Sequence, residues 1–244
     1  MRRKMPFLVP AALFAAALAA APPPAVADDG ALRLAVRAVG APPVLDDPAW
    51  AQAAPVELAP VPGGPAPAVR TSLRAAYDRE HLYLRFECEL PAALMEAGGR
   101  RTGGELKNRE SLDVRLAPVS GQDIYYRFIG GLAPDDRYDA ARGLITDFMH
   151  LLYGLEDPDW SGTWGYETRL ELEKARWLAF FKIPFATFGT GSPEPGAAWE
   201  GNFGRTHAPA TGRPARAAWS VTGPAGLEDF NAMRPLVFEV VPQP

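Results

Sequence analysis

Cysteine and histidine are scarce in this chain of 244 residues, which has one Cys and three His. Cys88 has no partner for an internal disulfide, so the fold must be stabilised by packing. The sequence also lacks an HExxH zinc-protease pair, a Gly-x-Ser-x-Gly nucleophile turn and a glycine-rich phosphate loop. These absences predict a protein that is not an enzyme.

Carboxylates that could cleave a glycosidic bond are not paired convincingly either. Glu87 and Glu89 share one strand face with Arg85, which is typical of a solvated charged face. Glu110 and Asp113 are three positions apart, so a strand would point them to opposite faces. Neither pair predicts a glycosidase.

Clusters of basic residues and long apolar runs are almost confined to the first residues. The net charge is −4, and no run of Lys and Arg follows residue 4, which argues against nucleic acid as a partner. An apolar stretch over residues 6–21 is too short to span a bilayer comfortably, and Ala25-Val-Ala27 fits a signal-peptidase site. We therefore expect a secretory signal peptide over residues 1–27, and a secreted or periplasmic mature chain without a membrane span.

Short strands dominate the rest of the chain. Nine segments either alternate apolar and polar residues or are rich in β-formers: 32–39, 69–77, 81–89, 111–116, 124–129, 164–172, 177–183, 199–207 and 236–240. Within the third of these, Cys88 shares a face with leucines and Phe86, as a core residue would. Turn residues between the runs predict one all-β domain over residues 28–244, an antiparallel β-sandwich of jelly-roll type.

Three segments depart from the strand pattern. An acidic pair before Pro48 predicts the start of a helix. The segment 55–67 has five prolines and two glycines, which predicts a loop that covers the sandwich. In the segment 138–153, four apolar residues repeat at helical spacing and predict a short helical insertion.

One face of the predicted sheet combines charged and aromatic residues. If the leucines and Val114 of strand 111–116 point inward, Asp113 and Arg115 point outward; by the same alternation Tyr125 and Arg127 share a face. Such a face suits a sugar, whose ring stacks on an aromatic side chain while planar polar groups bind its hydroxyls. It is equally typical of an ordinary solvated sheet face.

Three segments together resemble carbohydrate-binding module family 9 and its DOMON-like relatives: Ala75 to Glu89, Trp177 to Gly189 and Trp199 to Arg205. The resemblance covers the whole mature chain and implies a β-sandwich with a sugar-binding cleft on its concave face. It implies that Trp219 is the stacking platform and that Asp113, Arg127 and Asn202 bind hydroxyls. The second ring of the family's aromatic clamp is missing near Lys107, and its substitute would be one of three residues in the insertion: Tyr138, Trp160 or Trp164.

Two kinds of cofactor are considered from the residues. Asp135, Asp136 and Asp139, or Asp157 with Asp159, offer the oxygen ligands that calcium uses, although acidic turns are common. Some DOMON-like relatives bind a b-type haem through Met and His or Lys, but the candidates here are sequence neighbours or unpaired: Met149, His150, Met95, Met233 and His207. We therefore expect no cofactor and no haem, and the acidic turns leave room only for a structural calcium ion.

The sequence thus predicts a non-catalytic, exported domain that binds a sugar or glycan. Two alternatives stay open: a DOMON-like haem or redox domain, and a structural or interaction protein of the cell envelope that has lost the sugar site. Position along the strands further predicts that Trp177 and Trp199 are buried. Trp219 follows Ala217 and Ala218 and precedes a loop, so we expect it to be partly exposed at the mouth of the cleft.

Overall fold

The structure is a computed structural model that describes residues 34–67, 69–90, 109–119, 124–143, 156–157, 159–208, 213–221, 223 and 232–239. The predicted signal peptide lies outside these residues, as do Met95, Lys107, Met149 and His150. No helix in the described ranges has the length and apolar character needed to span a bilayer.

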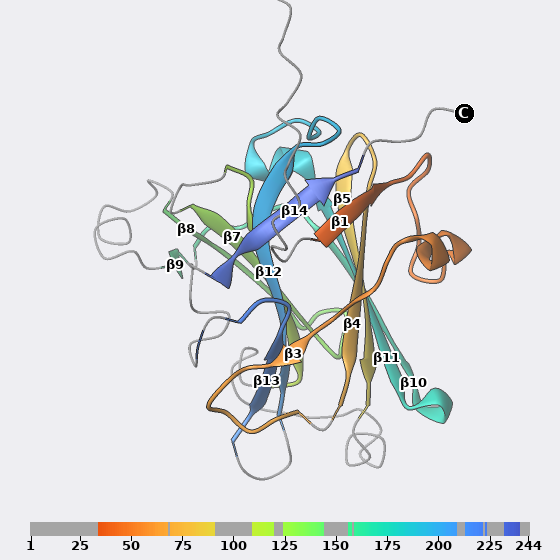
Figure 1. Ribbon diagram of the computed structural model, residues 1–244, viewed down its shortest axis with the longest axis vertical. Coiled ribbons are helices and arrows are strands. Elements are labelled where there is room, and N and C mark those ends of the chain that lie inside the picture. Colours follow the sequence, from red (N-terminus) through yellow and green to blue (C-terminus); the bar gives the residue numbers. More distant parts are fainter. Residues whose placement is uncertain are drawn as a thin grey trace, which may run out of the picture.

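Two layers of β-strands form the molecule (Figure 1). The first layer, called sheet I here, consists of β10 (Gly165–Glu171), β11 (Arg176–Pro184), β5 (His81–Glu89) and β4 (Thr71–Tyr77), with the short β2 (Val56–Glu57) on β4. The second, sheet II, consists of β14 (Arg234–Phe238), β12 (Ala198–His207), β6 (Ser111–Ala117), β7 (Tyr125–Gly131), β8 (Arg137–Arg142) and β9 (Glu156–Asp157). Strand β13 (Ala215–Ala218) also pairs with β12, and β3 (Ala59–Pro60) pairs with β13.

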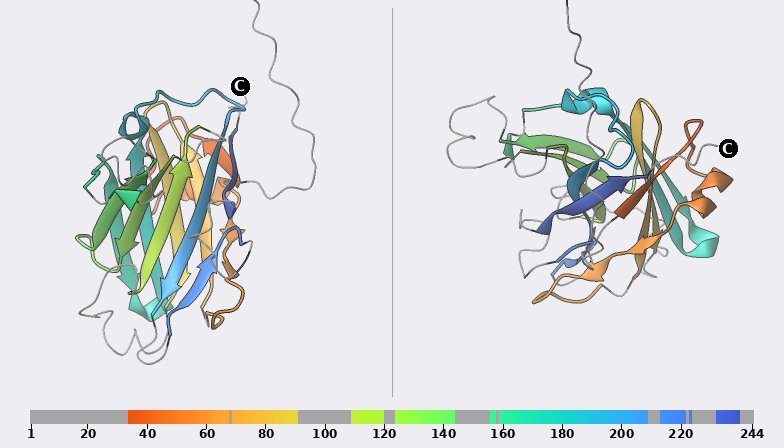
Figure 2. Two further views of the ribbon diagram at one scale, coloured as in Figure 1. Left: turned by 90° about the vertical axis from the view of Figure 1, so that its left-hand side faces the viewer. Right: turned by 45° about the horizontal axis from the view of Figure 1, so that its top comes forward.

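Strand β1 (Leu34–Ala38) joins the two layers. Its first three residues pair with β14, and its last two pair with β4, in both cases parallel. The other strand pairs of the described chain are antiparallel. The left panel of Figure 2 shows the green-to-blue strands of sheet II in front of sheet I. A strand that changes sheets in this way makes a corner between two packed layers.

Alternation of side chains fills the space between the sheets. Leu112, Val114 and Leu116 of β6 point inward, as do Phe181 of β11 and Phe86 of β5. Because successive strand residues point to opposite faces, the same strands leave charged side chains on the outside. The core also contains residues that were predicted to be buried, namely Trp177, Trp199 and Cys88.

All nine strands predicted from the sequence are confirmed, and the fold is the predicted all-β sandwich. The expected helix start at Pro48 is confirmed as a short 3-10 helix, η1 (Pro48–Gln52), capped by Asp47, whose carboxylate accepts from the Ala49 N–H at 2.8 Å. The predicted helical insertion is wrong where it is described, because residues 138–142 belong to β8, whose ladder with β7 satisfies their backbone groups. The proline-rich segment 55–67 is not only loop, since β2 and β3 lie within it.

Candidate functional site

The outer face of sheet II brings together the predicted charged and aromatic residues. Directly opposite residues of antiparallel strands share a face, and Arg115 of β6 lies opposite Arg127 of β7. One step along, Asp113 lies opposite Ile129, which lies opposite Tyr138 of β8. On the other side of the Arg115–Arg127 row, a third row completes the cluster with Tyr125, Arg142 and Glu156.

Arg127 is the centre of the charged network. Its Nη2 donates to Asp113 Oδ2 at 2.6 Å, and its Nε lies 3.0 Å from the same oxygen. On its other side, Nη1 donates to Glu156 Oε2 at 2.8 Å. The Arg127 side chain is 12% exposed and that of Glu156 is 22% exposed. A guanidinium held between two carboxylates in this way is fixed in direction.

Tyr125 is held at the edge of the same network. Its hydroxyl donates to Glu156 Oε1 at 2.6 Å, and the guanidinium groups of Arg115 and Arg142 lie 5.4 and 5.9 Å from the centre of its ring. Burial is the main cause that raises the pKa of this hydroxyl, and the Glu156 carboxylate adds to it against the opposing Arg115 charge. Tyr125 is only 5% exposed, so it supports the network and is not an open stacking surface.

Asp113 stays ionised although it is buried. Burial alone would raise its pKa, but the guanidinium groups of Arg127 and Arg115 outweigh this and hold the pKa below its ordinary value. The Arg115 Nε also approaches Asp113 Oδ1, at 3.4 Å. The network therefore fixes charged donors and acceptors on one face of sheet II, and groups of this kind bind sugar hydroxyls, although Asp113 and Arg115 are themselves largely buried.

Asn202 lies in the row beside Arg115, but its amide is used within the protein. The side-chain Nδ2 donates to Ser220 O at 2.8 Å, and Oδ1 accepts from the backbone N–H groups of Phe203 and Ser220. These bonds attach β12 to the chain that follows β13. The structure gives Asn202 a role in holding this corner, while its predicted contact with a sugar stays a prediction.

Trp219 does not lie at the mouth of a cleft, and the expected exposure is wrong. The residue is 5% exposed and packs in the core, with its ring centre 5.6 Å from that of Phe203. The cause is the ladder: Ala218 pairs with Gly204, and the Trp219 N–H then donates to Phe203 O, so the next side chain points inward. The indole Nε1 is buried without a hydrogen-bond partner in the described part of the chain.

Substitution of Trp219 should therefore change stability. We expect Trp219→Ala to lower the free energy of unfolding by about 3 kcal/mol, because it leaves a large cavity beside Phe203. Trp219→Phe should cost less than about 1.5 kcal/mol, because the ring volume is largely kept and an unpartnered N–H is removed. Urea denaturation measures both. An alanine variant with unchanged stability would contradict the buried position.

The three residues considered as a second clamp ring have different positions. Trp164 is buried against Phe128 and Phe181, and the Trp160 ring contacts Tyr126 and Phe128 on the core side. Tyr138 alone lies on the outer face of sheet II, in the row of Asp113, and it is half-buried. Burial first, and then the Glu156 carboxylate, raise the pKa of its hydroxyl. Tyr138 is therefore the aromatic side chain best placed to meet a ligand on this face.

The candidate calcium residues are not gathered into one site. Asp136 accepts from Arg109 at 3.0 Å, and Asp139 Oδ2 accepts from the Gly162 N–H at 2.7 Å on the core side of β8. Asp157 accepts from the backbone of Asp159 at 2.9 Å, within a turn. Among the described residues, no group of three or more His, Cys, Asp or Glu side chains is arranged to hold a metal ion.

The remaining haem candidates in the described chain are separated. His207 Nδ1 lies 2.8 Å from Glu110 Oε2, between the sheets at the start of β6. Met233 packs with Ala117 and Tyr125 at the other end of β6. The two side chains therefore do not form a pair of axial ligands.

A buried ionic cluster between the sheets, which the sequence did not predict, is formed by Glu110, Arg205 and His207. Arg205 Nε donates to Glu110 Oε1 at 2.7 Å, and its Nη groups donate to Thr71 Oγ1 at 3.0 Å and to Glu89 O at 2.9 Å. Sheet II is thereby tied to sheet I at one end. Burial would raise the pKa of Glu110, but the hydrogen bond from His207 and the charge of Arg205 hold it below its ordinary value.

Acid should weaken this cluster. Because the pKa of Glu110 is lower in the folded than in the unfolded chain, its contribution to stability is complete above about pH 4.3, the ordinary value for Glu, and is lost as the pH falls through the folded pKa. We expect the melting temperature of Glu110→Gln to fall less steeply with acid than that of the wild type. Melting curves between neutral pH and about pH 3 measure this. Equal slopes would show that Glu110 does not titrate as described.

Comparison with known proteins identifies the fold. No family model matches the sequence, and neither does any curated protein. Among solved structures, a carbohydrate-binding module of family 9 from Caldicellulosiruptor kristjanssonii in complex with cellotriose is 14% identical, with a TM-score of 0.58 over 87% of this chain and 99% of that chain. A family 9 module from the same organism in complex with glucose gives the same identity and TM-score, over 87% and 98% of the chains.

A third structure belongs to a protein from Bacteroides uniformis to which carbohydrate binding has been assigned provisionally. It is 17% identical, with a TM-score of 0.61 over 86% of this chain and 100% of that chain. At such identities a structural likeness establishes the fold. The chain has the β-sandwich fold of family 9 carbohydrate-binding modules, as its sequence predicted.

Proposed function

We propose that this protein is an exported, non-catalytic domain that binds a sugar or glycan on the outer face of sheet II. The observation that carries the proposal is the network around Arg127, where a guanidinium and two carboxylates are fixed on one sheet face beside Tyr138. Export is supported by the leader-like residues 1–27, with cleavage before Asp28. Binding needs no metal or haem in this proposal.

The chemistry of the face suits hydroxyl groups. A sugar hydroxyl both donates and accepts hydrogen bonds, so carboxylates and guanidinium groups at neighbouring positions can engage adjacent hydroxyls. Arg127 and Asp113 provide such neighbours, and the network fixes their directions before a ligand arrives. Preorganised groups lose little side-chain entropy on binding. Tyr138 supplies a ring at the edge of the face.

The first ligands to test are glucose and short β-glucans, since the structures of the same fold were solved with glucose and cellotriose. Buried Trp219 leaves one ring fewer than the sequence suggested, and this favours the alternative of an envelope interaction protein that has lost its sugar site. A glycan array followed by calorimetry separates the two. Saturable binding of a glycan supports our proposal, and a blank array with folded protein supports the alternative.

Tyr138 gives the proposal a residue-level test. We expect Tyr138→Ala to weaken glycan binding by about tenfold or more, because an aromatic contact at a binding face is a typical hot spot. The side chain is half-buried, so stability should change by less than about 1 kcal/mol. Leu172→Ala, which removes an exposed apolar side chain outside this face, is the control. Unchanged calorimetric affinity in Tyr138→Ala would exclude Tyr138 from the site.

A further inference from the structure

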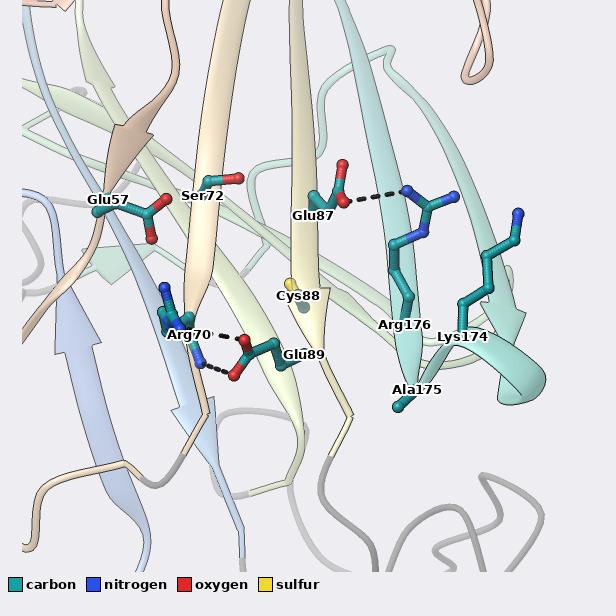
Figure 3. Close-up of a pocket in the computed structure, with 9 residues that line it drawn as sticks. All are labelled: Glu57, Arg70, Ser72, Glu87, Cys88, Glu89, Lys174, Ala175 and Arg176. Atoms are coloured by element: carbon teal, nitrogen blue, oxygen red, sulfur yellow. Dashed lines mark hydrogen bonds and ion pairs between the residues drawn. The ribbon is translucent and has the colours of Figure 1, made fainter.

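A hollow lies on the other side of the sandwich, on the outer face of sheet I (Figure 3). It has a volume of about 250 Å³ and extends from β2 across β4 and β5 to the turn before β11. Pockets for drug-sized molecules have volumes of roughly 300 to 1,000 Å³, so this one has room for a single sugar-sized ring. None of the residues of the sheet II cluster lines it.

Strand register builds one wall of this hollow. Glu57 of β2 lies opposite Ser72 of β4, which lies opposite Glu87 of β5, so the three side chains form one row on the outer face. Figure 3 shows the Glu57 carboxylate directed toward Ser72, with Glu87 beyond it. Within the described ranges, the side chains of Glu57 and Ser72 have neither a hydrogen bond nor an ion pair. Both are free to bind a ligand.

The basic residues around the hollow are already neutralised. Arg176 is bound on one side to Glu87 at 3.0 Å and on the other to Glu171 at 2.5 Å. Lys174 lies 3.3 Å from the same Glu171 carboxylate, and Arg70 lies 3.5 Å from Glu89. Burial works against ionisation of Glu87, but Arg176 and Arg85 outweigh it and lower its pKa. Of the charged side chains that line the hollow, Glu57 is therefore the one without an ion-pair partner among the described residues, and it is negative.

We propose that this hollow is a second binding site, which takes a small ligand carrying both an ammonium group and hydroxyls, such as an amino sugar. Glu57 binds the ammonium group, while the Ser72 hydroxyl and the ion-paired carboxylates of Glu87 and Glu89 bind hydroxyls. The hollow is open to solvent, so affinity is on the order of 1 mM. The proposal does not depend on sugar binding by sheet II, because the two faces share no residue.

Titration with protonated D-glucosamine, followed by the backbone amide signals of Ser72 and Glu87, tests this site. Glucose and N-acetylglucosamine are the matched probes, since they keep the ring and lack the charge. We expect saturable shifts with glucosamine and much smaller ones with the neutral sugars. Shifts of these signals that are equal for all three sugars, or absent for all three, would overturn the proposal.

Two substitutions of Glu57 distinguish binding at this site from non-specific attraction of the cationic sugar to the protein. Glu57→Lys should abolish the saturable shifts, and Glu57→Gln should weaken binding roughly threefold, as expected for one exposed charge pair. Glu57 is exposed, so both variants should melt like the wild type. Glu194→Lys makes the same charge change at an exposed position outside the hollow and should leave the titration unchanged. Equal loss in Glu57→Lys and Glu194→Lys would contradict a site at Glu57.

Discussion

Arg205→Ala is expected to lower the free energy of unfolding by about 3 to 5 kcal/mol, because it leaves the buried Glu110 carboxylate without its main counter-charge. Both side chains of this pair are 1% exposed, so water cannot replace the lost partner. The same substitution also removes the links from Arg205 to Thr71 and Glu89 of sheet I. Urea denaturation at neutral pH measures the loss.

Two further variants show whether charge is the cause. Arg205→Met combined with Glu110→Leu removes both charges and should cost much less than the sum of the two single changes, since neither member of this ion pair is left buried without the other. Arg169→Met breaks ion pairs with Asp46 and Glu171 at an exposed position and should cost less than about 1 kcal/mol. A single Arg205→Ala variant as stable as Arg169→Met would refute the buried cluster.

Trp177→Ala should have an effect of similar size, a loss of about 3 to 5 kcal/mol. The ring is fully buried, and its Nε1 donates to Thr168 Oγ1 at 2.6 Å. Removal leaves a cavity and takes away one of the hydrogen bonds of the Thr168 hydroxyl, which still donates to Leu132 O. Glycan binding on the outer face of sheet II should be kept wherever the variant is folded, since Trp177 points into the core. Chemical denaturation measures the loss of stability, and calorimetry on the same sample measures glycan binding. Loss of binding in a folded variant would contradict the assignment of Trp177 to the core and not to the binding face.

The alternation of side chains explains why most of the fold could be predicted. Period-two patterns placed Leu112 and Val114 on the core face of the sheet and Asp113 on the opposite face, and the structure confirms this for each of them. The short strand β9 has only two residues, too few for any pattern, so the position of Glu156 beside Arg127 could not be foreseen. Contacts of this kind depend on which strands become neighbours.

The position of Trp219 is a second feature that the local sequence pattern could not predict. Its neighbours Ala217 and Ala218 suggested a loop-facing residue, because β13 was not recognised as a strand. Once β13 pairs with β12, the register places the indole beside Phe203. Likewise, the opposite directions of Glu110 and Asp113 were predicted, but the partners of Glu110 lie at Arg205 and His207, far along the chain. Register and long-range pairing, which local patterns do not encode, decide these positions.

The central claim, that the outer face of sheet II binds a glycan, is tested most directly by mapping the glycan that binds best on an array onto the backbone amide signals of the protein. Our account predicts that the largest saturable shifts occur at Asp113, Arg127 and Tyr138, on the three neighbouring strands of that face. Shifts confined to other parts of the molecule, or no glycan that produces any, would contradict it.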